Sequence, residues 1–255
     1  MILTDTHTHI YYETDEEKLT QQMQRCSDNG IYRFFLPNVN SASIPLVLDL
    51  GKRYPETCFP MLGLHPCDVK EDYEKELSQI YQAVQKEQVY AIGEIGMDLY
   101  WDKTFIKEQQ HSFRTQIAWA KELDLPIVIH CRDAFEEVFE VLEDLKDEKL
   151  RGIFHCFTGD LEQAHKAIQL NFYLGIGGVL TYKKAGLAEV IQDIDVKHLV
   201  LETDAPYLAP VPYRGKPNES AYLIHVAQKL ADIKGMSLEQ VAEITTANSI
   251  KAFGV

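Results

Sequence analysis

The stretch 126-PIVIHCRDAFEEVFEVLEDL-145 combines the two patterns that decide the fold class. Its first residues, Pro126–His130, form a short apolar run that is typical of a strand covered on both faces. Large apolar residues then recur at helical spacing, which predicts a helix with one core-facing side. They are Phe135, Val138, Phe139, Leu142 and Leu145. A strand followed directly by a helix is the repeating unit of α/β proteins.

The same alternation extends along the whole chain. Strands are predicted at Ile2–His7, Tyr32–Leu36, Phe59–Leu64, Val89–Glu94, Pro126–His130, Gly152–His155, Phe172–Ile176 and His198–Thr203. Apolar stripes predict helices within Tyr73–Val84, Phe113–Leu123 and Ala221–Ile233. A further helix is expected over Ser237–Ile244, where Ser237 and Gln240 have the spacing of a capping box.

Eight strands alternating with helices in 255 residues favour a closed (β/α)8 TIM barrel of the α/β class. We expect a single domain over residues 1–255. A doubly wound open sheet is the competing architecture, and it usually carries a glycine-rich phosphate loop after its first strand. The segment 5-DTHTHIYY-12 contains no glycine, so the dinucleotide-binding fingerprint is absent.

The composition limits the possible partners. The net charge of −14 argues against a protein that holds a long nucleic-acid duplex by its phosphates, because such proteins usually present a basic surface. A small ligand or a strand end fits better. No apolar run approaches membrane-spanning length and no signal peptide is visible, so we expect no membrane partner. Five cysteines without CxxC spacing favour a cytoplasmic location. No obligate protein partner is inferred.

Polar residues follow or close six of the predicted strands. They are His7, His9, His65, Glu94, His130, His155 and Asp204. In a barrel the carboxyl ends of all strands meet at one mouth, where active sites lie. His7 and His9 are also two residues apart, so on an extended strand their side chains would point the same way. Residues that are distant in sequence are therefore expected to form one cluster.

Imidazoles and carboxylates together suit two divalent metal ions, with Zn²⁺, Mn²⁺ or Mg²⁺ as candidates. We expect His7 and His9 to bind one ion with Asp204, and His130 and His155 to bind the other. Glu94 is placed to bridge the two ions. Such a pair can activate a water molecule and stabilise both the entering and leaving oxygens of a phosphoryl displacement.

Two of these residues have further candidate roles. Asp204 could also take the proton of the attacking water as a general base. His65 is interpreted as a contact to the substrate or transition state, or alternatively as a support for a metal ligand. Glu202 should point away from the face of Asp204 and support the structure through a hydrogen bond.

The chain resembles the TatD-type deoxyribonucleases, which belong to the metal-dependent hydrolase superfamily of (β/α)8 barrels. The resemblance spans nearly the whole chain and rests on "DTHTH", "GLHP", "AIGEIGMD", "PIVIHCRDA", "GIFHCFTG", "YLGIGG", "LVLETDAPYLAP" and "RGKPNES". It implies hydrolysis of DNA phosphodiester bonds with divalent metal ions, often from strand ends. The ligand pattern it implies falls on His7, His9, Glu94, His130, His155 and Asp204.

The sequence departs from the family pattern at two places. The loop 214-RGKPNES-220 has one basic residue fewer than usual, and Cys67 stands where another histidine is common. The candidates for substrate binding are Arg132, Arg214 and Lys216, because arginine can fork onto phosphate oxygens and lysine offers a point charge. Tyr182, Tyr207 and Tyr213 are possible stacking partners for bases.

These observations predict a metal-dependent deoxyribonuclease or phosphodiesterase. The alternative is an amidohydrolase-like enzyme that cleaves a C–N or lactone bond; such sites often bridge their metals with a modified lysine, whereas strand four offers Glu94. A third hypothesis is a barrel that binds metal without catalysis.

Overall fold

The eight predicted strands all form, and they pair in sequence order. The computed structural model describes residues 1–255. The strands are β1 (Leu3–Asp5), β2 (Ile31–Pro37), β3 (Cys58–Met61), β4 (Ile92–Asp98), β5 (Ile127–Arg132), β6 (Gly152–Phe154), β7 (Phe172–Ile176) and β8 (Leu199–Leu201). Neighbours pair in parallel from β1 to β3 and from β4 to β8.

Two contacts close these sheets into a barrel. Leu62 forms a parallel bridge with Ile92, which joins β3 to β4. The Thr6 amide donates to the Leu201 carbonyl at 3.0 Å, which joins β1 to β8. The chain is therefore a (β/α)8 barrel, as the alternation of strands and helices predicts.

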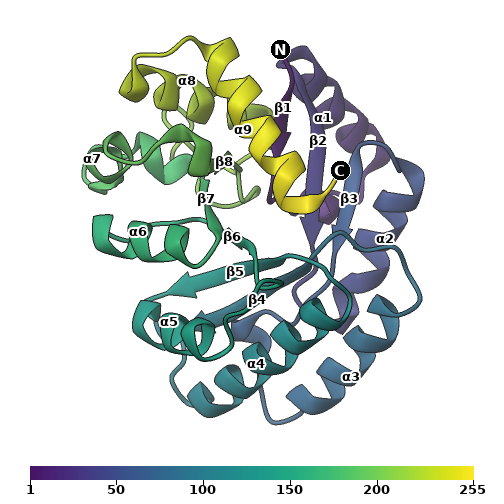
Figure 1. Cartoon of the computed structure of the whole chain (residues 1–255). Coiled ribbons are helices and arrows are strands. Elements are labelled where there is room, and N and C mark those ends of the chain that lie inside the picture. Colours follow the sequence, from purple (N-terminus) through teal and green to yellow (C-terminus); the bar gives the residue numbers. More distant parts are fainter.

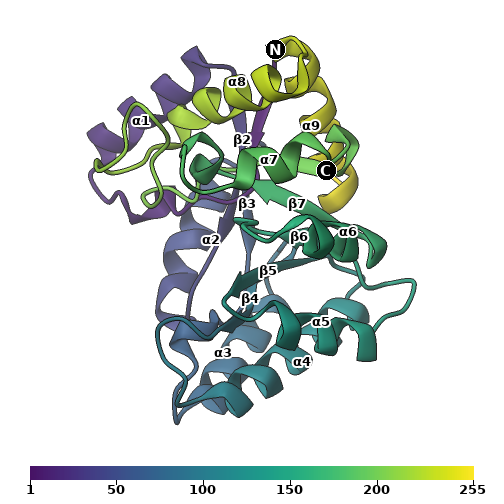
Figure 2. The ribbon, with the colours of Figure 1, turned by 90° about the vertical axis from the view of Figure 1, so that its left-hand side faces the viewer.

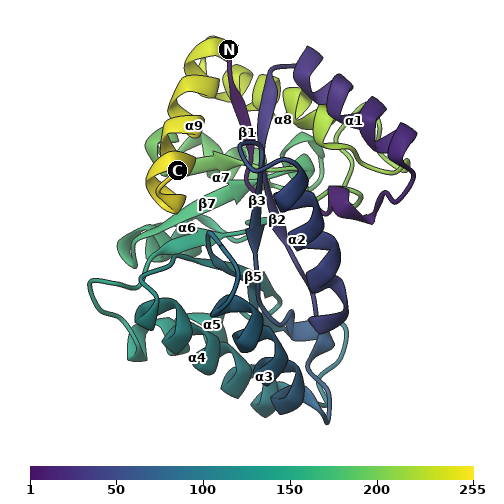
Figure 3. The same ribbon diagram turned by 90° about the vertical axis from the view of Figure 1, so that its right-hand side faces the viewer.

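Nine α-helices accompany the strands. They are α1 (Glu16–Asp28), α2 (Ile44–Arg53), α3 (Tyr73–Val84), α4 (Ile106–Glu122), α5 (Phe135–Asp144), α6 (Leu161–Gln169), α7 (Leu187–Gln192), α8 (Leu223–Lys234) and α9 (Leu238–Phe253). Helices α1 to α8 form a ring around the strands, and α9 crosses in front of this ring (Figure 1). Helices α3, α4 and α5 cover one side of the barrel, and α1, α8 and α9 cover the opposite side (Figures 2 and 3). None of the helices is both long and apolar enough to cross a membrane.

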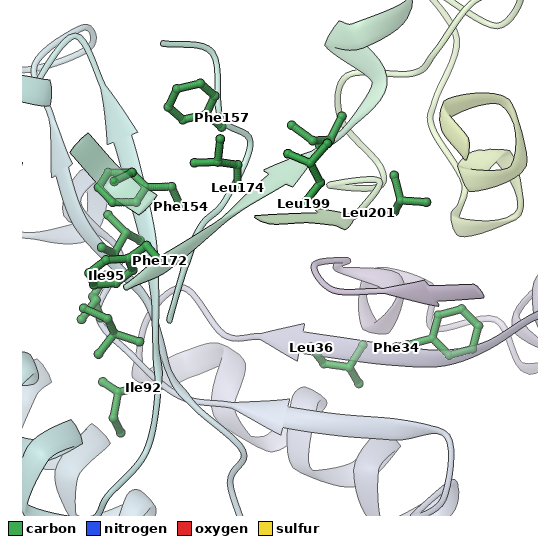
Figure 4. Packing of buried hydrophobic residues seen from close by; sticks show 14 of the residues in the cluster. Phe34, Leu36, Ile92, Ile95, Phe154, Phe157, Phe172, Leu174, Leu199 and Leu201 are labelled. Carbon is green, nitrogen blue, oxygen red and sulfur yellow. The ribbon is translucent and has the colours of Figure 1, made fainter. Parts of the chain in front are cut away.

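Side chains of each strand alternate between two cores, as the two-residue period of a strand requires. Phe34 and Leu36 of β2 belong to the large cluster between strands and helices, part of which Figure 4 shows. Phe35, between them, points instead into the barrel and joins a smaller buried cluster. Its ring stacks on Phe253 of α9 with centroids 3.7 Å apart. The last helix therefore closes the barrel interior at the end opposite the strand carboxyl termini.

Helix α9 ends nine residues beyond the predicted Ser237–Ile244. Thr245 and Thr246 have low helix propensity, so the local pattern weakens after Ile244. Burial of Ala252 and Phe253 in the barrel interior compensates for this weakness. The predicted capping box is present, with Ser237 Oγ accepting from the Gln240 amide at 3.2 Å.

Replacing Ser237 by alanine should lower the free energy of unfolding by about 1 kcal/mol, because the amide of Gln240 loses its acceptor. Urea unfolding followed by circular dichroism measures this change. Ser78→Ala is the matched control, since Ser78 is exposed in the middle of α3 and caps nothing. Equal destabilisation by both substitutions would contradict a capping role for Ser237.

Several strand boundaries differ from the prediction. β1 ends at Asp5, so His7 and His9 lie beyond the strand and their positions do not follow from strand alternation. β4 runs from Ile92 to Asp98, so Glu94 lies within the strand rather than at its end. The reason is the apolar continuation Ile95–Met97, which is fully buried and pairs with β5.

Candidate metal centre

The carboxyl ends of the strands bring all seven predicted polar residues to one cavity or its floor. His7 and His9 follow β1, His65 precedes the short helix η3 (Pro66–Asp68), His155 follows β6 and Asp204 follows β8. Glu94 and His130 belong to β4 and β5. The cavity has a volume of about 480 Å³, and all of these residues except His7 line it. His7 is fully buried beneath the others.

Glu94 lies at the centre of the cluster, with its side chain only 3% exposed. Its Oε2 is 3.1 Å from His7 Nε2. Its Oε1 is 2.8 Å from His130 Nδ1, 3.2 Å from His65 Nε2 and 3.3 Å from His155 Nε2. One carboxylate thus contacts four imidazoles that come from four different βα units.

Asp204 lies on the side of the cluster formed by His7 and His9, and its side chain is 15% exposed. Its Oδ1 is 3.5 Å from His9 Nε2 and 3.8 Å from His7 Nε2. The rings of His7 and His155 stack with centroids 3.6 Å apart. Three groups have ligand atoms close enough to share an ion: His7, His155 and Asp204; His7, His9 and Glu94; and His65, Glu94 and His130.

This grouping differs from the expected one in two respects. His155 lies with His7 and Asp204 rather than with His130 alone. His65, which is not in the expected ligand set, lies within the cluster, because its Nε2 is 3.3 Å from His130 Nδ1. Sequence spacing could not give either result, since both depend on how far each loop carries its side chain beyond the strand.

The hydrogen bonds of His9 and His65 identify which ring nitrogen carries a proton. The Tyr11 hydroxyl donates its single proton to the Pro37 carbonyl at 2.6 Å, so His9 Nδ1 must donate to that hydroxyl. His9 Nε2 therefore presents a lone pair to the cluster. For His65 the opposite holds: Nδ1 accepts from the Cys67 amide at 3.0 Å, so Nε2 carries the proton and faces Glu94 as a donor.

The residues fit a divalent metal ion. His7 Nδ1 is buried and has no polar partner, while His7 Nε2 and His155 Nδ1 are buried beside the carboxylates of Glu94 and Glu202, at 3.1 Å and 3.0 Å. Burial lowers the pKa of His7, and the neighbouring His155 lowers it further, so His7 is a neutral imidazole with an available lone pair. Unpartnered buried nitrogens are costly and need a functional explanation. Neutral imidazoles and carboxylates are the metal ligands that borderline cations prefer.

The charges of the cluster support the same conclusion. Burial by itself would raise the pKa of Glu94, but His65, His155 and His7 hold it well below the usual range. Burial would lower the pKa of His155, but Glu202 and Glu94 raise it to about 10. In the metal-free chain His155 thus acts as a counter-charge for the buried acids Glu94 and Glu202. Divalent cations would supply the same positive charge.

Further acids hold the cluster histidines in place. Asp98 Oδ2 is 2.9 Å from His130 Nε2, while Oδ1 accepts from the amides of Tyr100 and Trp101. Glu202 Oε1 accepts from the Cys156 amide at 2.6 Å and lies 3.0 Å from His155 Nδ1. The predicted supporting role of Glu202 fits this position. The contact of Asp98 with His130 is an addition that β4 makes possible by running four residues past Glu94.

The three predicted substrate-binding residues are not together. Arg132 lines the cavity, and its guanidinium packs 3.8 Å from the ring centroid of Tyr100. Arg214 packs 4.3 Å from the ring centroid of Tyr182, and neither Arg214 nor Lys216 lines the cavity.

The candidate tyrosines are divided as well. Tyr207 lines the cavity, whereas the Tyr182 hydroxyl donates to the Ala209 carbonyl and Tyr213 stacks on Tyr222. Two further aromatic residues line the cavity, Tyr12 and Trp101, and no sequence motif identifies them as site residues. For Trp101 the available signal is its position in the sequence, because Tyr100 and Trp101 follow shortly after Asp98 at the end of β4.

Glu202→Gln should lower the affinity for metal by about 10- to 100-fold, because a neutral amide no longer fixes the charge and orientation of His155. Competition with a chromophoric chelator measures this affinity. The matched control is Glu189→Gln on the exposed surface of α7. Unchanged affinity in a folded Glu202→Gln variant would contradict the supporting role.

The comparisons with known proteins agree with this site. The family of TatD related DNases matches residues 4–254. The chain is 38% identical to the uncharacterized metal-dependent hydrolase YabD of Bacillus subtilis, over 100% of both chains. It is 30% identical to the 3'-5' ssDNA/RNA exonuclease TatD of Pantoea ananatis, over 97% of this chain and 96% of that protein. The crystal structure of YjjV, a TatD homolog from Escherichia coli K12, superposes with a TM-score of 0.93 at 28% identity, covering 99% and 98% of the two chains.

A (β/α)8 barrel with this cluster of histidines and acids at its carboxyl end is a metal-dependent hydrolase. The chain belongs to the family of TatD related DNases. The resemblance that the sequence motifs indicate is therefore confirmed.

Proposed function

We propose that the chain hydrolyses phosphodiester bonds at the ends of DNA strands, with two divalent metal ions at the cluster. The observation that carries this proposal is the central position of Glu94, whose two oxygens face histidines on both sides. The ions would be held by His7, His9, Glu94, His130, His155 and Asp204. When bound, such a pair lowers the pKa of a water molecule and neutralises charge on phosphate oxygens.

Asp204 is the proposed general base. Its Oδ1 faces His7 and His9, which leaves Oδ2 to take the proton of the attacking water. The side chain is partly exposed, so it can reach a water molecule in the cavity. A base within hydrogen-bonding reach of the water contributes about 100- to 10,000-fold to the rate.

His65 and Arg132 are proposed to contact the phosphate. The proton on His65 Nε2 makes this residue a donor, so it suits a phosphate oxygen better than a metal ion. Arg132 lines the same cavity and can donate two hydrogen bonds to phosphate. The roles of Arg214 and Lys216 in substrate binding stay predictions, and these residues would contact a longer substrate outside the cavity.

The preference for strand ends rests on charge and on a relative. The net charge of −14 leaves few cations to follow a long backbone, so local contacts at a strand end suit this chain better. A relative at 30% identity is named a 3'-5' ssDNA/RNA exonuclease. A cytoplasmic location and the absence of an obligate protein partner stay predictions; all five cysteines are unpaired.

The test removes bound metal and reloads the protein with Mg²⁺, Mn²⁺ or Zn²⁺. Each form is offered single-stranded DNA, duplex DNA and a panel of amides and lactones. We expect cleavage of single-stranded DNA from its ends, restored by metal. Turnover of amides or lactones without any phosphodiester cleavage would favour the amidohydrolase alternative. No turnover by a folded, metal-loaded chain would favour a binding protein.

A further inference from the structure

Trp101 is the most exposed large hydrophobic residue of the chain, with 69% of its surface open to solvent, and it lines the cavity of the metal centre. Its backbone is held by a hydrogen bond, and a cation lies beside its ring. Its amide donates to Asp98 Oδ1 at 3.0 Å, and the Arg132 guanidinium lies 5.2 Å from its ring centroid. Together with the exposed Tyr100 ring, whose centroid lies 4.9 Å away, the Trp101 ring forms a contiguous aromatic surface at the rim of the site, which is typical of a binding surface.

The surroundings of Trp101 indicate what it binds. The ring of the exposed Tyr100 lies 4.9 Å from it, the charged Arg132 and Asp102 lie beside it, and the pocket on its other side also contains the apolar Val69 and Phe105. An aromatic ring beside a guanidinium can bind one nucleotide, because the base stacks on the ring and the phosphate pairs with the cation. The ring also opens onto the cavity in which hydrolysis is proposed.

We propose that the Trp101 ring stacks on the base of an unpaired nucleotide next to the bond that is cleaved, and thereby selects single-stranded ends. This inference rests on the proposed function. Bases inside a duplex have both faces covered and a terminal base pair has one open face, whereas an unpaired base can offer either face to Trp101. Stacking is tolerant of sequence because every base has an aromatic face.

Asp98 contacts both the backbone at Trp101 and the metal centre. One of its oxygens holds the amides of Tyr100 and Trp101, and the other holds His130 Nε2 at 2.9 Å. A single buried carboxylate therefore ties the backbone at Trp101 to the cluster. At the other end of the cluster the Tyr12 and Tyr207 rings lie 5.5 Å and 5.9 Å from the His9 ring. Aromatic rings thus flank the metal centre on two sides.

The test compares Trp101→Ala, Trp101→Phe and a control, Tyr32→Ala, on the metal-loaded protein. Tyr32 is an exposed aromatic residue at the start of β2, at the opposite end of the barrel. The substrates are a single-stranded oligonucleotide and the same strand with abasic sites at its terminal positions. We expect Trp101→Ala to raise KM about 10-fold on the normal strand and to leave the abasic strand unaffected. Trp101→Phe should recover most of the loss.

Binding gives a readout that does not need catalysis. Trp101 and Trp119 are the only tryptophans, and Trp119 is 9% exposed. A phosphorothioate-protected single strand should quench the fluorescence of the unaltered protein but not that of Trp101→Phe. Quenching that depends on Trp101 without hydrolysis would leave stacking supported and overturn the proposed function. If the protein hydrolyses DNA but Trp101→Ala raises KM equally on both strands, or on neither, then stacking alone is overturned.

Discussion

Replacing Glu94 by alanine should lower kcat for phosphodiester cleavage by about 1,000-fold or more, while the barrel stays folded. The carboxylate contacts four histidines and faces both halves of the cluster. Without it the two proposed metal sites lose their shared ligand, and the neutralising charge for those histidines is gone. Initial rates on a labelled single strand and metal content by mass spectrometry measure the effect.

The control for this substitution is Glu140→Ala. Glu140 is an exposed acid in the middle of α5, so its removal changes the net charge equally without touching the cluster. We expect activity and metal content close to those of the unaltered protein. If Glu94→Ala retains activity with an unchanged metal content, then Glu94 does not bridge the two ions.

Replacing Gly96 by alanine should destabilise the fold by about 3 to 5 kcal/mol and abolish activity. Gly96 has a φ of +137°, a backbone conformation that residues with a side chain rarely adopt. A Cβ there would lie 2.1 Å from the backbone carbonyl oxygen of His130 on the paired strand. Strands β4 and β5 would have to separate at the point where they hold Glu94, Asp98 and His130 together.

Gly177→Ala is the matched control. Its added Cβ would meet nothing nearer than 3.6 Å, and its φ of −113° is acceptable for alanine. Urea unfolding of the two variants gives the difference in the free energy of unfolding. If Gly96→Ala is as stable as Gly177→Ala, the close approach of β4 to β5 at the metal centre is not as described.

The sequence predicts the barrel because every strand and helix has its own periodic signal. The stripe that starts at Phe135 and the apolar run Ile127–Ile129 each contain enough large residues to identify their element. Boundaries are harder to predict where apolar residues continue beyond a polar one. For this reason the sequence pattern predicts that the strand ends at Glu94, whereas Ile95 and Met97 extend β4 to Asp98.

The set of residues in the site was also predictable, but not their arrangement. Parallel strands of a barrel must bring their carboxyl ends together, so histidines and acids at those ends converge. Which of them share an ion depends on loop paths that no periodicity describes, as the stacking of His7 on His155 illustrates. Long-range contacts such as Asp98 with His130 require knowledge of strand register.

Anomalous diffraction from crystals of the chain loaded with Mn²⁺ tests the central claim most directly. We predict two ions per chain, with Glu94 between them and His7, His9, His130, His155 and Asp204 around them. A single ion, or ions outside the cluster that surrounds Glu94, would contradict the proposed binuclear centre.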